Sequence, residues 1–101
     1  MSNVVREKKR LQRLRILQVV SMVRPDTLGD GLIRKALAPE LDIVPGIEEC
    51  RRALDYLDER GLVKVVSRTP EVWFVKVTAD GTDFLDGTGP SLAGVAQPDE
   101  F

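Results

Sequence analysis

The 101-residue sequence contains no histidine and only one cysteine, Cys50. The common zinc sites need several cysteine and histidine ligands, so this composition excludes them. The usual general base and every nucleophile–histidine pair are excluded as well. No acidic cluster has the Asp-x-Asp-x-Asp-Gly spacing of a calcium loop. We therefore expect no metal, no cofactor and no small-molecule ligand, and we expect that the protein is not an enzyme.

Long hydrophobic runs are also missing. No apolar run approaches the ~20 residues that are needed to cross a bilayer. The charged N-terminus lacks the apolar stretch and cleavage site of a secretory signal. A single cysteine cannot form an internal disulfide. These absences predict a cytoplasmic protein with no membrane partner, and the length predicts one domain with one core.

Charge is distributed unevenly along a chain whose net charge is only −1. Residues 1–24 hold seven basic residues and one acidic residue, whereas residues 25–101 hold eight basic and fifteen acidic residues. A basic front on an acidic body indicates an anionic partner that is met at the N-terminus. A solvated helical face would produce the same pattern.

The first predicted helix covers residues 7–23 and is stopped by Pro25. Its apolar residues occupy more than one side, and its second half is apolar nearly all round. Such a helix is either central to its domain or shared with a second subunit. We expect both roles, and hence a homodimer whose interface includes Leu11, Leu14 and Met22.

Two further helices are predicted to form a helix-turn-helix. The shorter one runs from Asp30, its expected N-cap, to Ala38. The longer one has Pro45 at its first position and ends at Gly61 in a left-handed cap. Apolar residues recur on it at spacings of three, four and three, which predicts a buried stripe: Ile47, Cys50, Leu54 and Leu57. Cys50 is therefore expected to be a core residue.

A β-hairpin is predicted next, with strands over residues 62–66 and 72–77 and a turn over 68–71. A final short helix is expected from Thr78, its cap, to Leu85. Residues 88–101 are rich in glycine, proline and small side chains, so they are predicted to form a disordered tail.

The expected centre of the turn sets the register of the hairpin. It places Trp73 opposite Val66 and Phe74 opposite Val65. Trp73 would then face the core together with the other odd-numbered residues of its strand. Phe74 and Val65 would lie on the outer face, where something else covers them or they stay partly exposed.

The run Ala53–Val63, the hairpin and the step Val77-Thr78-Ala79-Asp80-Gly81 together resemble the winged-helix superfamily. In that superfamily a recognition helix ends in Leu-x-x-x-Gly-Leu-Val, a wing follows, and an apolar-Thr-x-x-Gly step leads into a last helix. The resemblance implies an α+β winged helix-turn-helix fold over residues 1–87, with three bundled helices, a C-terminal β-hairpin wing and a short final helix.

A narrower resemblance rests on Val5-Arg6-Glu7, residues 10–17, the run 32–37 and the corner Gly61-Leu62-Val63. These segments are similar to a small winged-helix protein of Mu-like transposable phages and prophages, a regulator type that is related to arsenic-responsive repressors. The paired cysteines of the metal-sensing repressors are missing, so metal sensing is not implied. The resemblance implies a phage-encoded protein that acts in the host cytoplasm.

The fold predicts a regulator of transcription that binds double-stranded DNA as a dimer. The third helix would enter the major groove, the wing would flank it, and the basic N-terminal segment 1–10 would contact phosphates. The residues expected to contact DNA are Arg51, Arg52, Arg68, Lys64, Lys8, Lys9 and Arg10. Glu48 and Glu49 oppose this interpretation, because they bring negative charge to the end of the helix that approaches the DNA, although they also complement the helix dipole.

An alternative class of function is an interaction module that binds another protein and no DNA, for example in phage assembly or packaging. The acidic isoelectric point, the acidic first turn of the third helix and the sparsely charged wing favour this alternative. Tyr56 on the third helix would help to cover either a dimer partner or a groove, and the sequence does not separate the two.

Overall fold

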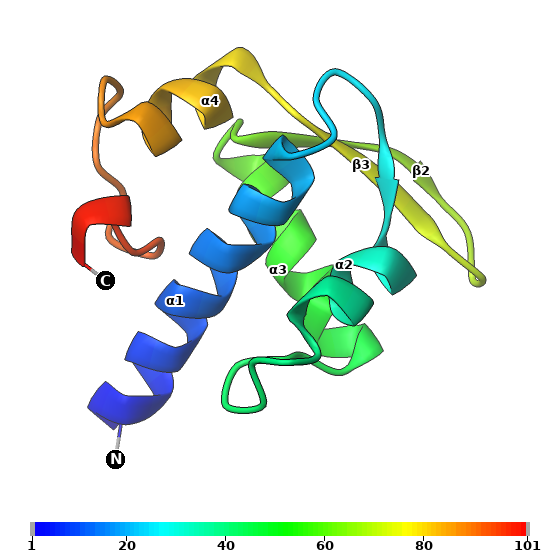
Figure 1. The fold of residues 1–101 in the computed structure, drawn as a ribbon, viewed down its shortest axis with the longest axis horizontal. Helices are drawn as coiled ribbons and strands as arrows, with labels where there is room; N and C mark the ends of the chain where they lie inside the picture. Colours follow the sequence, from blue (N-terminus) through cyan, green and yellow to red (C-terminus); the bar gives the residue numbers. More distant parts are fainter. Residues whose placement is uncertain (1, 101) are drawn as a thin grey trace.

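The computed structural model describes residues 2–100, which form four α-helices and one three-stranded antiparallel sheet (Figure 1). The predicted α+β class is confirmed. The elements, in chain order, are α1 (Ser2–Ser21), β1 (Leu28–Gly29), α2 (Asp30–Leu37), α3 (Ile47–Glu59), β2 (Val63–Arg68), β3 (Trp73–Val77), α4 (Ala79–Asp86) and a short 3-10 turn, η1 (Pro98–Glu100).

Helix α1 is the centre of the domain and begins at Ser2, five residues before the predicted start. Residues 3–9 are exposed on every side, whereas Ile16, Leu17 and Val20 are completely buried. Helix α1 contacts α2, α3, β3 and α4, and the chain itself covers the apolar side chains in the second half of the helix, whereas Val4 and Val5 near its start stay exposed. Leu14 is 2% exposed and belongs to this core, which contradicts its prediction as a dimer contact.

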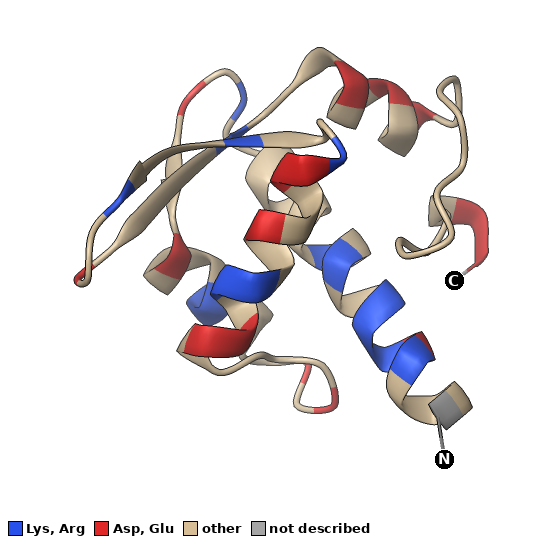
Figure 2. Cartoon of the chain, turned by 180° about the vertical axis from the view of Figure 1, so that it is seen from behind, with Lys and Arg blue, Asp and Glu red and all other residues tan. Residues whose placement is uncertain are grey.

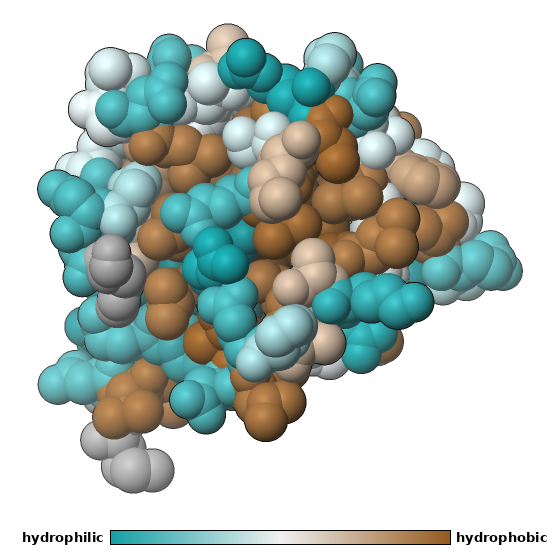
Figure 3. All heavy atoms as spheres, in the orientation of Figure 1, coloured by the Kyte–Doolittle hydropathy of each residue, from teal (hydrophilic) through white to brown (hydrophobic). Residues whose placement is uncertain are grey.

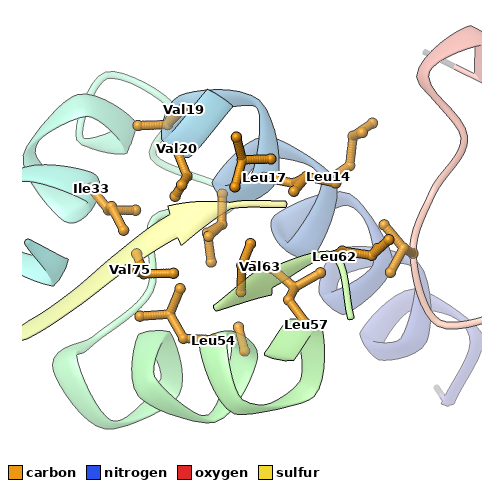
Figure 4. Packing of buried hydrophobic residues seen from close by; sticks show 14 of the residues in the cluster. Leu14, Leu17, Val19, Val20, Ile33, Leu54, Leu57, Leu62, Val63 and Val75 are labelled. Atoms are coloured by element: carbon orange, nitrogen blue, oxygen red, sulfur yellow. The ribbon is translucent and has the colours of Figure 1, made fainter. Parts of the chain in front are cut away.

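The core lies between α1 on one side and α3 with the sheet on the other (Figure 4). The apolar stripe of α3 is confirmed for Cys50, Leu54 and Leu57, which are fully buried, but not for Ile47, which is 37% exposed at the first position of the helix. The buried cluster also takes Ile33 from α2 and Val75 from β3. Burial of one such aliphatic side chain contributes ~1.5–3 kcal/mol, so this cluster is the main source of stability.

Both predicted helix starts need correction. The N-cap of α2 is Gly29 and that of α3 is Gly46, each in an extended conformation with no side-chain capping bond. Asp30 is therefore inside α2, and its carboxylate accepts hydrogen bonds from Arg51 and from the Trp73 amide instead of capping the helix. Pro45 lies outside α3. Gly61 adopts a φ of 78° after α3, which confirms the predicted left-handed turn.

The sheet has the order β1-β3-β2, with both pairs antiparallel. The predicted register of the hairpin is wrong, because the turn is centred between Pro70 and Glu71 and because an irregularity between Val65 and Ser67 shifts the pairing by one residue. Trp73 lies opposite Arg68, and Val65 lies opposite Val75. An extra residue in one strand turns the following side chains to the other face, so Val65 is 7% exposed in the core instead of lying on the outer face.

Strand β1 was not predicted. It has only two residues, and Leu28 and Gly29 pair with Val75 and Phe74 of β3. So short a strand is defined by its partner and leaves no pattern of alternation in the sequence.

Helix α4 matches its prediction. The Thr78 hydroxyl accepts a hydrogen bond from the Gly81 amide at 3.0 Å, and Gly87 closes the helix with a φ of 77°. The segment that follows was predicted to be disordered, and the structure contradicts this: residues 88–100 return along α1 (Figure 1). Val95 and Ala96 are fully buried. They fill apolar space that α1 and α4 leave open, and this space exists only after the helices have packed.

Candidate nucleic-acid interface

Arg51, one of the two predicted reading residues of α3, is not available to DNA. Its Nε donates to Asp30 Oδ2 at 2.7 Å, and its guanidinium also donates to the Pro70 carbonyl at 3.2 Å. Its side chain is 15% exposed and that of Asp30 is 1% exposed. The second carboxylate oxygen of Asp30 accepts from the Trp73 backbone amide at 3.2 Å. Arg51 is therefore a structural residue that joins α3 to α2 and to the hairpin.

Arg68, the predicted cation of the wing, is paired with α3. It donates to Asp55 at 2.8 Å and to Asp58 at 3.4 Å, and its guanidinium lies 5.0 Å from the centre of the Trp73 ring. The hydrogen bond to Asp55 is the main reason why the pKa of Arg68 is raised. The Arg68 side chain is 45% exposed, so these pairs contribute only ~0–1 kcal/mol, but two nearby carboxylates lower the positive potential that the wing would offer to a phosphate.

Arg10 is also engaged within the chain. It donates to Glu7 at 2.7 Å, to Glu100 at 3.0 Å and to the Ala93 carbonyl at 2.8 Å. The hydrogen bonds that Arg10 donates to Glu7 and Glu100 raise its pKa. Its side chain is only 17% exposed, so Arg10 holds the C-terminal segment against α1 and is not free to bind DNA.

Four of the predicted or neighbouring cations remain exposed and form no ion pair within residues 2–100: Arg6, Lys8, Lys9 and Arg52. Lys64 on β2 is exposed too, and it lies opposite Lys76 across the hairpin. Figure 2 shows basic residues along the first half of α1 and in the middle of α3, between acidic residues at both ends of α3.

Several of these cations meet in a cleft between α1 and α3. Lys9, Arg13 and Arg52 line this cleft of about 130 Å³, together with one carboxylate, that of Glu49. Arg6 lies one turn before Lys9 and shares its side of α1 by helical spacing. We call Arg6, Lys9, Arg13 and Arg52 the cation cluster. Lys8 lies about 100° round the helix from Lys9 and does not belong to it.

Tyr56 on α3 contacts Arg13, one of the residues that line the cleft. Its ring is stacked between the guanidinium groups of Arg13 and Arg60, each 3.8 Å from the ring centre. Arg13 also donates to the Gly94 carbonyl at 2.9 Å. Burial lowers the pKa of Arg13, and the nearby Arg60 charge acts in the same direction. The sequence could not show this arrangement, since it depends on the docked C-terminal segment.

The only cysteine of the chain is a core residue. Cys50 is fully buried, and burial raises the pKa of its thiol to about 12. No group of three or more cysteine, aspartate or glutamate residues in the described chain could hold a metal ion. Within residues 2–100, no helix combines the length and the apolar character that crossing a membrane requires.

Comparisons with known proteins give no match to any family model, any curated protein or any solved structure. The function proposed for this chain is therefore inferred from its own sequence and geometry.

Proposed function

We propose that the protein is a winged-helix DNA-binding protein that contacts the DNA backbone mainly through the cation cluster. The order α1-β1-α2-α3-β2-β3 and the strand order β1-β3-β2 support the winged-helix assignment. In this fold α3 is the helix that faces DNA, with the wing on one side and the start of α1 on the other. The observation that carries the proposal is that Arg6, Lys9 and Arg52 are exposed and form no ion pair within residues 2–100. Figure 2 shows basic residues on both helices concerned, α1 and α3.

Phosphate groups suit this surface because each contact with Lys or Arg releases counterions from DNA. Arg6, Lys9 and Arg52 lose no internal ion pair within residues 2–100 when they bind a phosphate, whereas Arg10, Arg51 and Arg68 would have to break one. The proposed interface therefore differs from the predicted one.

Recognition of base sequence by α3 is weakly supported. Arg51 is held by Asp30, and Glu48 and Glu49 lie in the first turn of α3. These carboxylates repel phosphates at the helix end that approaches the groove. We accordingly propose binding with little preference for sequence, in a role as a phage-type regulator that acts in the host cytoplasm.

The test is binding of a fluorescent mixed-sequence duplex, measured by anisotropy over a range of salt concentrations. The variant Lys9→Gln with Arg52→Gln removes two proposed phosphate contacts. We expect the slope of log K against log salt to fall in magnitude by about 1.8, because each contact contributes about 0.9. The affinity for unrelated sequences should fall to the same extent.

The matched control is Arg24→Gln with Lys35→Gln, which removes the same charge from exposed residues outside the cluster. This variant should keep the wild-type slope. Equal losses in both double variants would show that net charge alone causes binding and would refute the proposed interface. Absence of salt-dependent binding by the wild type would refute DNA binding altogether.

We also propose that two copies associate through the open face of α1, as a revised form of the predicted dimer. Met22 is 81% exposed and Val4 is 75% exposed, and both share one face with Leu11 by helical spacing. This face lies opposite the cation cluster, so a dimer would leave both clusters accessible. Sedimentation at micromolar concentration should give twice the monomer mass, and Val4→Glu with Met22→Glu should halve it. A monomeric wild type would refute the association and would leave the DNA proposal intact.

A further inference from the structure

An open apolar groove of about 630 Å³ lies between α2 and the outer side of the sheet. Its apolar walls come from Leu32 on α2, Val44 after α2, and Val72 and Phe74 on the hairpin. Leu32 is 58% exposed and Phe74 is 39% exposed. Figure 3 shows hydrophobic side chains gathered at the right of the molecule, over α2 and the adjoining strands.

The fold does not use these side chains for its own core. The inward side of α2 is supplied by Ile33 and Leu37, which are fully buried, and Leu32 points away from them. Phe74 alternates with the buried Val75 and so lies on the outer face of the sheet. The C-terminal segment packs on α1, not over this groove.

Glycine contributes to the depth of the groove. A Cβ at Gly29 would lie 3.1 Å from Val72, so the Val72 side chain would have to shift by a few tenths of an ångström, and 3.5 Å from Phe74, which is an ordinary contact. Gly31, at the start of α2, has no side chain to fill the space beside Leu32, and a Cβ there would meet nothing within 4 Å. The floor is therefore made of backbone, and the walls are apolar.

The charge around the groove has one sign. Arg34 and Lys35 are among its lining residues and no carboxylate is, although acidic residues outnumber basic ones in the chain by 16 to 15. The Arg34 Nε donates to the Pro45 carbonyl at 3.0 Å, which fixes the guanidinium at the rim. The complementary ligand has apolar side chains for the walls and carboxylates for the rim.

We propose that this groove docks a short segment of a partner protein, in which apolar or aromatic residues are flanked by aspartate or glutamate. The volume falls in the range of ~300–1,000 Å³ that is typical of ligand sites, and the shape suits an extended or helical peptide. DNA is a poor occupant, because phosphates gain nothing from Leu32 and Phe74. A second copy of the chain is also unfavourable, since the exposed part of α1 is basic and would be repelled by Lys35.

The first test is selection from a display library of random peptides of about twelve residues, a length that spans such a groove. The full-length protein is the bait. Selected peptides should contain two or more Leu, Ile, Phe or Trp residues next to Asp or Glu. Basic peptides, no enrichment, or enrichment of stretches of this chain's own sequence would overturn the proposal.

The second test locates the binding site with one enriched peptide, labelled for anisotropy. Leu32→Asp should weaken binding by about tenfold or more, as loss of a central apolar contact does. Leu41→Asp is the matched control, because Leu41 is 83% exposed and lies outside the groove; its affinity should be that of the wild type. Lys35→Glu should weaken binding by about fivefold, and more at low salt than at high salt.

Folding is checked by thermal denaturation, which none of these exposed substitutions should shift by more than a few degrees. A Leu32→Asp protein that is folded and binds the peptide like the wild type overturns the proposal. Equal losses for Leu32→Asp and Leu41→Asp overturn it as well, since binding would then follow general hydrophobicity and not this groove. Neither outcome depends on whether the cation cluster binds DNA.

Discussion

The ion pair between Asp30 and Arg51 allows a quantitative prediction for Asp30→Ala. The carboxylate is 1% exposed and accepts hydrogen bonds from the Arg51 side chain and the Trp73 backbone amide. Alanine leaves a largely buried guanidinium without its counter-charge and a backbone N–H without its acceptor. Removing one partner of a buried pair costs ~3–5 kcal/mol, which is a large share of the ~5–15 kcal/mol that stabilises a typical domain.

The measurement is urea unfolding followed by the fluorescence of Trp73, which is the only tryptophan of the chain. The double variant Asp30→Ala with Arg51→Met removes both charges and replaces the guanidinium by an apolar side chain. It should recover about 2 kcal/mol relative to Asp30→Ala, because the uncompensated charge is gone. Arg52→Ala, at the next and exposed position, is the control and should change stability by less than ~0.5 kcal/mol.

Two results would refute this reasoning. One is an Asp30→Ala protein within ~1 kcal/mol of the wild type, which would mean that the pair is solvated in solution. The other is a double variant no more stable than the single one, which would mean that the cost comes from lost packing and not from an orphaned charge.

Three further predictions concern the tail, a glycine and the cysteine. Truncation after Gly87 should lower stability by ~2–4 kcal/mol, because it removes fully buried apolar residues. Calorimetry should show a melting temperature lower by ~10–20 °C, and an unchanged melting temperature would support the predicted disorder of the segment. Gly81→Ala should destabilise the fold by ~1–3 kcal/mol despite the better helix propensity of alanine, because a Cβ there would overlap the Leu62 carbonyl. Gly31→Ala should not destabilise it, because a Cβ there has open space. Burial raises the pKa of Cys50 from the usual thiol value of 9.0 to about 12, so the native thiol should resist alkylation at neutral pH. The free energy of unfolding should fall as the pH rises from 9.0 toward 12, because the unfolded chain loses the thiol proton first.

Local signals predicted the helices and the hairpin well. The stripe ending at Leu57, the left-handed Gly61 and the Thr78 cap each depend on a few adjacent residues, and each is found in the structure. The start of α1 was missed because Val4 and Val5 are β-branched residues with low helix propensity, which does not favour extending the helix before Glu7. The irregularity beside Val65 was missed because an extra strand residue has no signature in a run of β-branched residues.

The candidate site was predicted less well, for a reason that lies in tertiary structure. Asp30 and Arg51 are 21 positions apart, and nothing near either residue indicates that they pair. Arg10 and Glu100 are 90 positions apart. The sequence identifies which residues are cationic, but the fold determines which of them form ion pairs within the chain. Because Arg10, Arg51 and Arg68 form such pairs, the proposed interface keeps Lys9 and Arg52 and leaves those three out.

The packing of residues 88–100 along α1 joins the beginning and the end of the polypeptide. Ala96 donates its amide to the Arg10 carbonyl, and Arg10 in turn binds Ala93 and Glu100. These contacts join residues more than 80 positions apart, and contacts of such long separation form only after the intervening chain has closed a large loop. This part of α1 therefore gains its cover late in folding, and a folding intermediate that has not yet docked residues 88–100 would present it to chaperones or proteases.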